Sequence, residues 1–351
     1  MRPSLIACAY SDCFFLHSIL RVLTSSVFQG LGVWFSITRS PDRQITRSSY
    51  PVIPRGLSIN YPVALFSNIK ITLEMIKWEH SIFALPFALC GAMLAAGGWP
   101  RWGQLAWIVV CMISARSAAM AFNRLADARI DAANPRTATR AIPAGTLSPK
   151  FVATFVLLSC AVFVASAAQL NRLSFYLSPV ALAVVLLYSY TKRFTRWSHL
   201  VLGFALGIAP AAAWIAVRGS LDPRILVLTA AVTFWVGGFD VLYACQDIDF
   251  DRANALNSIP QAFGVPRALL LARTLHVIML GLLAWLPLLF GLGKVALFGV
   301  AAVALLLLYE HSLVSARDLS KLNAAFFTMN GVIAVVFFVF MAADLLLRSV
   351  H

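Results

Sequence analysis

Long apolar runs recur along most of this 351-residue chain, and they constrain its fold more than any other feature. The residues are 60% hydrophobic and only 12% charged, which is about half the charged share of an ordinary soluble domain. Such runs can cross a bilayer as helices, because a helix satisfies its own backbone polar groups. The sequence therefore predicts an all-α, polytopic membrane protein with about nine transmembrane helices around a central cavity. Nine candidate spans follow Ile71, at roughly residues 80–98, 104–122, 151–168, 173–191, 199–217, 224–244, 268–290, 295–309 and 324–347.

The first 68 residues differ from the rest of the chain. They contain several Arg, Ser and Pro residues and only short apolar runs. The lack of a clear small-residue cleavage site argues against a secretory signal peptide. We expect residues 1–68 to be an extension, either disordered or the product of a start assigned too far upstream. A short amphipathic anchor is the alternative. Residues 69–351 would then form the transmembrane domain.

The net charge of +14 could indicate nucleic-acid binding, but the basic residues flank the predicted spans. Of the 28 lysines and arginines, 13 lie in the loops after the second, fourth, sixth and eighth spans, and only five lie in the opposite loops. The positive-inside rule places the first set of loops in the cytoplasm. The sequence therefore predicts a multi-pass protein of the inner, cytoplasmic membrane, with the lipid bilayer as its environment and no nucleic-acid partner.

Two clusters of aspartate lie just outside predicted spans and hold six of the fourteen acidic residues. Asp127 and Asp131 follow the second span, and their four-residue spacing puts them on one helical face. The second cluster follows the sixth span, on the same predicted side. Carboxylates at a membrane face are costly unless something pairs with them, and Mg²⁺ prefers carboxylate and water oxygens together with substrate phosphates. The acidic residues of the two clusters are Asp127 and Asp131 in the first, and Asp240, Asp247, Asp249 and Asp251 in the second.

Basic residues accompany both acid clusters. Acids followed by arginines suit a Mg²⁺-diphosphate, because metal and guanidinium groups can share its negative charge. The simpler alternative is that Asp127 and Asp131 pair with Arg124 and Arg129 at a solvated helix end. Two clusters on one side, each with basic neighbours, favour the functional interpretation. The candidate diphosphate ligands are Arg136, Arg140, Lys192 and Arg193.

These stretches resemble the motifs of the UbiA family of intramembrane aromatic prenyltransferases, over roughly residues 70–347. The family shows Asn-x-x-x-Asp-x-x-x-Asp after its second helix and Asp-x-x-Tyr-x-x-x-Asp-x-x-x-Asp later in the chain. The matching residues are Asn123, Asp127 and Asp131 for the first motif, and Asp240, Tyr243, Asp247 and Asp251 for the second. The sequence departs from the pattern at Arg124, where many members have Asp, and at Ile142, which interrupts the usual Arg-Pro-Leu-Pro run.

The resemblance implies Mg²⁺-dependent transfer of a polyprenyl group from polyprenyl diphosphate to an aromatic acid, most closely 4-hydroxybenzoate, in quinone biosynthesis. A naphthoate in menaquinone biosynthesis is the alternative acceptor. Asn123, Asp127 and Asp131 would hold one Mg²⁺, and Asp240, Asp247 and Asp251 a second, with these five aspartates as the catalytic residues. The base that removes the ring proton is either the diphosphate or an aspartate of the second motif.

Arg116 and Tyr243 are the expected acceptor-binding residues. Arg116 lies inside the second span, about two helical turns before Asn123. It either snorkels toward the headgroups or lines a cavity, and intramembrane charges favour the cavity. Arg140 is a further candidate for the acceptor carboxylate. An ion-coupled transporter is a hypothesis of a different class, but its carboxylates would lie near the midplane on broken helices.

Overall fold

The computed structural model describes residues 70–76, 84–316, 318–319, 322 and 328–349. All of them belong to the second of the chain's two units, Ser67–His351. This part of the chain is built from helices and contains no β-strand. The predicted extension at residues 1–68 lies outside the described residues.

Eight of the described helices are long and apolar enough to cross a membrane. They are α4 (Trp102–Ala126), α6 (Pro149–Leu170), α7 (Arg172–Thr191), α8 (Ser198–Arg218), α9 (Ile225–Ala244), α12 (Val265–Phe290), α13 (Lys294–Ser312) and α15 (Asn330–Ser349). Helix α3 (Leu85–Ala96) has 12 residues and stands at the first predicted span, just after residues 77–83, which are not described. The prediction of an all-α polytopic membrane protein is therefore confirmed.

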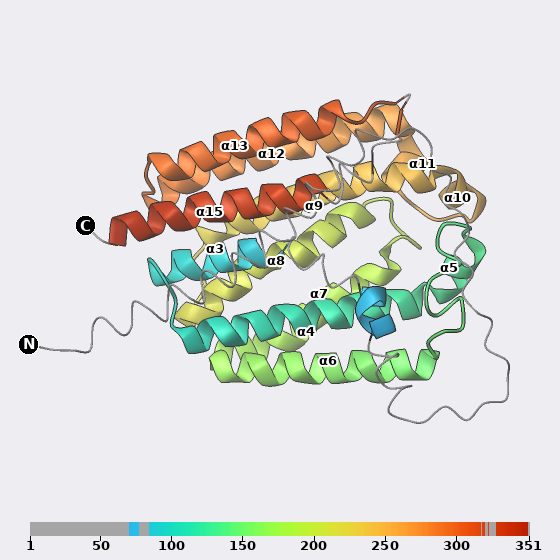
Figure 1. Ribbon diagram of the computed structural model, residues 1–351, viewed down its shortest axis with the longest axis horizontal. Coiled ribbons are helices and arrows are strands. Elements are labelled where there is room, and N and C mark those ends of the chain that lie inside the picture. The colour runs from blue at the N-terminus through green and yellow to red at the C-terminus, as the bar shows by residue number, and fades with distance from the viewer. Residues whose placement is uncertain (1–69, 77–83, 317, 320–321, 323–327, 350–351) are drawn as a thin grey trace, which may run out of the picture. The chain divides into compact units, whose positions relative to one another are not determined.

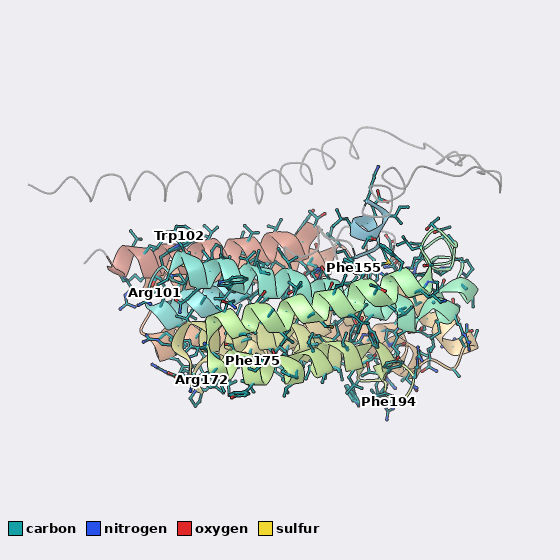
Figure 2. All side chains as sticks on the ribbon, turned by 90° about the horizontal axis from the view of Figure 1, so that it is seen from below. Arg101, Trp102, Phe155, Arg172, Phe175 and Phe194 are labelled. Atoms are coloured by element: carbon teal, nitrogen blue, oxygen red, sulfur yellow. The ribbon has the colours of Figure 1, made fainter. Side chains whose placement is uncertain are left out.

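Three short helices gather at one end of the long ones (Figure 1): α5 (Ala128–Ala133), α10 (Ile248–Ala253) and α11 (Ile259–Phe263). Helix α9 reaches this end and continues through a 3₁₀ turn, η2 (Cys245–Asp247), into α10. We call this end of the helices the motif end, because both aspartate motifs lie there. Figure 2 shows Phe194 at the motif end, and Arg101, Trp102 and Arg172 at the other.

Small residues let α8 and α9 approach each other closely, as is typical of helix pairs in membranes. Gly203 and Gly207 of α8 face Thr233 of α9, and a β-carbon on either glycine would overlap the backbone or side chain of that threonine. Further along α9, Trp235 is fully buried against Phe87 and Phe239, with ring centroids 4.9 and 5.1 Å away. Helix α9, which carries the second motif, is therefore held rigidly in the middle of the described helices.

We expect Gly203→Ala to lower the free energy of unfolding by about 1–3 kcal/mol, because the added methyl group would force α8 away from α9. Gly281→Ala is the matched control in helix α12. Nothing lies within 4 Å of a β-carbon built there, and Ala is about 0.8–1.0 kcal/mol better than Gly in a helix interior. Thermal unfolding of the purified protein in detergent would test this. Equal responses at the two glycines would contradict the close packing.

Candidate active site

The first motif lies where α4 ends. Asp127 is the C-cap residue of α4, and the side-chain amide of Asn123 donates to its Oδ2 at 3.0 Å. Arg193, which follows α7, donates from Nη2 to Asp127 Oδ1 at 3.1 Å and to the carbonyl oxygen of Ala126 at 2.7 Å. Burial raises the pKa of Asp127, and the hydrogen bond from Arg193 opposes that shift. Both oxygens of this carboxylate are therefore engaged.

Asp131 is buried one helical turn further on, in α5. Its Oδ1 accepts a hydrogen bond from Arg140 Nη1 at 2.7 Å. The hydroxyl of Thr137 donates to the backbone oxygen of Asp131 at 3.0 Å, so the loop that carries Arg140 folds back over the helix. The other carboxylate oxygen, Oδ2, is buried and has no hydrogen-bond partner. A buried oxygen of this kind is costly unless a ligand satisfies it.

The second motif is joined to the loop after the first motif by Arg136. Its guanidinium makes a two-pronged contact with Asp247, from Nε at 2.9 Å and from Nη2 at 2.7 Å. The same group donates to the hydroxyl of Tyr243 at 3.3 Å and lies 5.6 Å from the centre of that ring. Burial acts to lower the pKa of Arg136, but the hydrogen bond and the charge of Asp247 outweigh it and raise the pKa. This pair fixes the two motifs against each other.

Lys192 binds the last aspartate of the second motif. Its Nζ lies 3.5 Å from both oxygens of Asp251, which is buried. The backbone oxygen of Lys192 accepts from the amide of Asn257 at 2.8 Å, so the α7–α8 loop is attached to the segment after α10. By contrast, the Asp249 side chain is 95% exposed and lies 4.0 Å from Arg252. Asp249 therefore lies outside the site.

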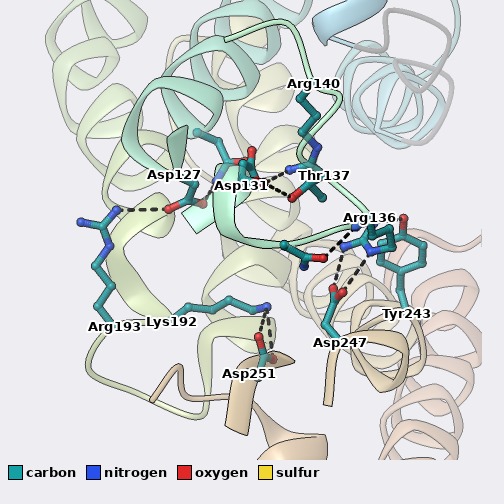
Figure 3. A network of polar contacts seen from close by, with 12 residues as sticks. Asp127, Asp131, Arg136, Thr137, Arg140, Lys192, Arg193, Tyr243, Asp247 and Asp251 are labelled. Atoms are coloured by element: carbon teal, nitrogen blue, oxygen red, sulfur yellow. Dashed lines mark hydrogen bonds and ion pairs between the residues drawn. The ribbon is translucent and has the colours of Figure 1, made fainter. Parts of the chain in front are cut away.

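Three of the four acid–base pairs join different loops, as Figure 3 shows, and the fourth, Arg140–Asp131, lies within the connection that follows α4. Asp127 pairs with Arg193, and Asp131 pairs with Arg140. The structure therefore does not show the alternative in which these acids pair with Arg124 and Arg129. The loops after α4, α7 and α9 therefore build one polar site at the motif end. Every predicted diphosphate ligand lies in it.

Two residues that the sequence did not single out as ligands belong to this site. His199, in the first turn of α8, lies with its Nδ1 2.6 Å from Asp240 Oδ2. A lone histidine at the start of an apolar span was the only indication of its role. Arg124, in the last turn of α4, is half-buried within electrostatic range of Asp127, Asp131 and Arg140, and it pairs with none of them.

Arg116 lies in α4, half-buried, and it is not without a partner. The structure thus places it in the same helix as the first motif, about two turns from Asn123. Its predicted contact with the acceptor stays a prediction.

The site suits a metal that arrives with a phosphate better than a closed metal cage. Among the described residues, no three Asp, Glu, His or Cys side chains converge as a group that could hold a metal ion. Mg²⁺ does not need such a group, because it is usually held by one or two carboxylates, waters and substrate phosphates. The unpartnered Oδ2 of Asp131 offers one ligand oxygen of the right kind. The residues present therefore fit Mg²⁺, and the full set of six ligands stays a prediction.

The helices and the paired site describe a multi-pass membrane protein with one polar site for a charged substrate. Residues 84–332 match the UbiA prenyltransferase family, and the chain belongs to this family. It is an enzyme, a prenyltransferase. The resemblance seen in the two motifs is thereby confirmed.

Relatives and solved structures agree with this assignment. The chain is 33% identical over 248 residues to the 4-hydroxybenzoate octaprenyltransferase of Cupriavidus necator, covering 70% of this chain and 85% of that one. The apo structure of a UbiA homolog from Aeropyrum pernix K1 superposes with a TM-score of 0.70 at 33% identity, covering 76% of this chain and 98% of that one. A UbiA homolog from Archaeoglobus fulgidus, solved with GPP and Mg²⁺, shares the fold with a TM-score of 0.63 at 19% identity, covering 78% and 99%.

Proposed function

We propose that this enzyme transfers a polyprenyl group from polyprenyl diphosphate to an aromatic acid, with 4-hydroxybenzoate as the first candidate acceptor. The observation that carries the proposal is the set of three acid–base pairs that link the loops of both motifs into one site. The C. necator relative, named as a 4-hydroxybenzoate octaprenyltransferase, supports the choice of acceptor. We place the motif end on the cytoplasmic side of the inner membrane, because its loops carry many more basic residues than the opposite loops.

The basic residues would bind the diphosphate. Without substrate, carboxylates hold Arg136, Arg140 and Arg193 at the motif end, each at 3.1 Å or less. An arriving diphosphate offers oxygens of the same charge and geometry, so these guanidinium groups can donate to it without leaving the site. Lys192, at the longer distance of 3.5 Å from Asp251, would add a point charge. These donors would stabilise the negative charge that develops as the carbon–oxygen bond breaks.

The acidic residues would hold Mg²⁺ together with the diphosphate. The candidates are Asn123, Asp127, Asp131, Asp240, Asp247 and Asp251. The ion would supply Lewis-acid stabilisation of the leaving group when bound. Each carboxylate that gives up a basic partner to the diphosphate gains a free oxygen, so the exchange leaves no charge unpaired.

The remaining steps would occur beside the apolar helices. Loss of diphosphate leaves an allylic cation, which an apolar cavity protects from water. The ring of Tyr243, at the border of the polar site, could stabilise that cation by cation–π contact. The aromatic carbon of the acceptor then attacks, and the ring proton passes to the diphosphate or to an aspartate of the second motif.

The acceptor carboxylate needs a basic side chain that is not already paired with an aspartate of the site. Arg140 is bound to Asp131 at 2.7 Å, which weakens its candidacy. Arg124 is half-buried, lies beside Tyr188 and is paired with no acid. We therefore add Arg124 to Arg116 and Tyr243 as a candidate acceptor-binding residue.

We expect Arg124→Gln to raise the KM for the aromatic acid about 10-fold or more, because a hydrogen bond to a charged group contributes about 1.5–3 kcal/mol. A phenol without the carboxylate should react equally well with both forms. The control is Arg129→Gln, on the exposed side of α5. A rise in the KM for polyprenyl diphosphate alone would instead assign Arg124 to the diphosphate.

Product masses from a panel of acceptors would test the proposed function. Purified protein would receive one polyprenyl diphosphate and, in turn, 4-hydroxybenzoate, a dihydroxynaphthoate and benzoate. We expect prenylated 4-hydroxybenzoate as the main product. A prenylated naphthoate would support the menaquinone alternative, and no product from any acid would contradict the proposal. The transporter hypothesis is set aside, because the chain is a family enzyme whose paired acids lie at one end of the helices.

A further inference from the structure

His199 is a buried imidazole held between three elements. It is 1% exposed, in the first turn of α8. Its Nδ1 lies 2.6 Å from Oδ2 of Asp240, in α9, and the backbone amide of Ile259, at the start of α11, donates to its Nε2 at 3.4 Å. Because an amide can only donate, Nε2 accepts, and the ring proton lies on Nδ1, which donates to Asp240.

The surroundings leave this imidazole little freedom. Ile259 and Ser258 are fully buried, and the Ser258 hydroxyl accepts from the amide of Gln261, which fixes the start of α11. On the other side, a β-carbon built on Gly237 of α9 would come within 3.6 Å of the backbone oxygen of His199. The ring is therefore fixed relative to both the second motif and the segment that follows it.

Asp240 belongs to the second motif and shares one neighbour with the first. Tyr188, in α7, is within electrostatic range of both Asp240 and Asp127. The Asp240 side chain is 23% exposed although its partner is buried. One of its oxygens is held by His199, so the other is left for the site.

We propose that His199 is a positioning residue, which orients the Asp240 carboxylate so that its free oxygen can bind the metal-diphosphate. The inference rests on the proposed function, in which Asp240 is a metal-binding residue. Carboxylates that bind metals are commonly fixed by a second hydrogen bond of this kind, and its loss typically costs about 10–100-fold in metal affinity or activity.

His199 could instead only support the start of α11 through Ile259. Two variants that place an amide at different positions distinguish this structural role from the orientation of Asp240. The side-chain amide of Asn lies near the position of Nδ1, so His199→Asn keeps a donor to Asp240 and loses the acceptor for Ile259. The longer Gln places its amide near Nε2, so His199→Gln keeps the acceptor for Ile259 and loses the donor to Asp240. If His199 orients Asp240, His199→Asn should retain metal binding and activity. If His199 only supports α11, His199→Gln should retain them instead.

The experiment measures Mn²⁺ binding by electron paramagnetic resonance on the purified protein with an unreactive prenyl thiolodiphosphate, together with turnover and thermal unfolding. We expect His199→Gln to lose about 10–100-fold in Mn²⁺ affinity and in kcat, with an unchanged unfolding midpoint. His199→Asn should retain most of both. Equal losses in the two variants, or wild-type values in His199→Gln, would overturn the proposal.

A measurement on the unsubstituted protein covers the case in which a variant does not fold. With ¹⁵N-labelled histidine, the Nδ1–H resonance of His199 should shift when Mg²⁺ and the thiolodiphosphate are added, because Asp240 then shares its charge with the metal. An unmoved resonance in a protein that binds Mn²⁺ would overturn the role of His199 alone. A protein that neither binds Mn²⁺ nor transfers a prenyl group would contradict the proposed function instead.

Discussion

Asp247→Asn should lower kcat by at least about 10²–10³-fold, the usual cost of removing one group that stabilises developing charge. In the unsubstituted protein, Arg136 makes a two-pronged contact with Asp247 at 2.7 and 2.9 Å. Asparagine keeps the volume of the side chain and one acceptor for Arg136. It removes the charge that the proposed metal-diphosphate complex requires. Turnover of the purified protein, with the unfolding midpoint measured alongside, would test this.

The control for Asp247 lies two residues further along the same motif. Asp249 has a 95% exposed side chain, so Asp249→Asn should change kcat by less than about twofold, as for other exposed charges. Similar activity in both variants would show that the paired carboxylate is not used in the reaction. A fall in activity that follows a fall in the unfolding midpoint would assign the Arg136–Asp247 pair to folding.

Removal of divalent cations should abolish turnover, and added Mg²⁺ should restore it. Mg²⁺ is bound at 2.0–2.1 Å in octahedral geometry, whereas Ca²⁺ needs longer distances and more ligands, so Ca²⁺ should restore much less. Full activity in excess EDTA would contradict a metal-dependent reaction.

The same treatment should leave the folded enzyme intact. Asp127, Asp131, Asp247 and Asp251 are paired with Arg193, Arg140, Arg136 and Lys192, which balance the charge of these carboxylates. EDTA should therefore leave the thermal unfolding midpoint unchanged in the absence of substrate. A large drop in that midpoint would indicate a structural metal instead.

Much of the fold could be predicted from hydropathy, because each span is a continuous apolar run. The sixth predicted span ends at residue 244, as α9 does. The first span was predicted from residue 80, but α3 begins at Leu85, with Pro86 in its first turn. Proline fits the start of a helix and not its interior, a local effect that average hydropathy does not detect.

The candidate site was predicted in its residue types but not in its pairing. The spacing of Asp127 and Asp131 placed them on one face, and the motifs identified the family. Three of the four pairs join residues far apart in the sequence, as in the 111-residue separation of Arg136 and Asp247. No local pattern reports such a contact, because it depends on how α4, α7 and α9 pack. His199 was missed for the same reason.

The most direct test of the account measures product and diphosphate together. Purified protein in lipid would receive Mg²⁺, ³²P-labelled polyprenyl diphosphate and ¹⁴C-labelled 4-hydroxybenzoate, so that free diphosphate and prenylated acid can each be counted over time. The account predicts equal amounts of the two, with little release when the acid is omitted and none from Asp247→Asn. Release of diphosphate without prenylated acid, or no release in the complete mixture, would contradict it.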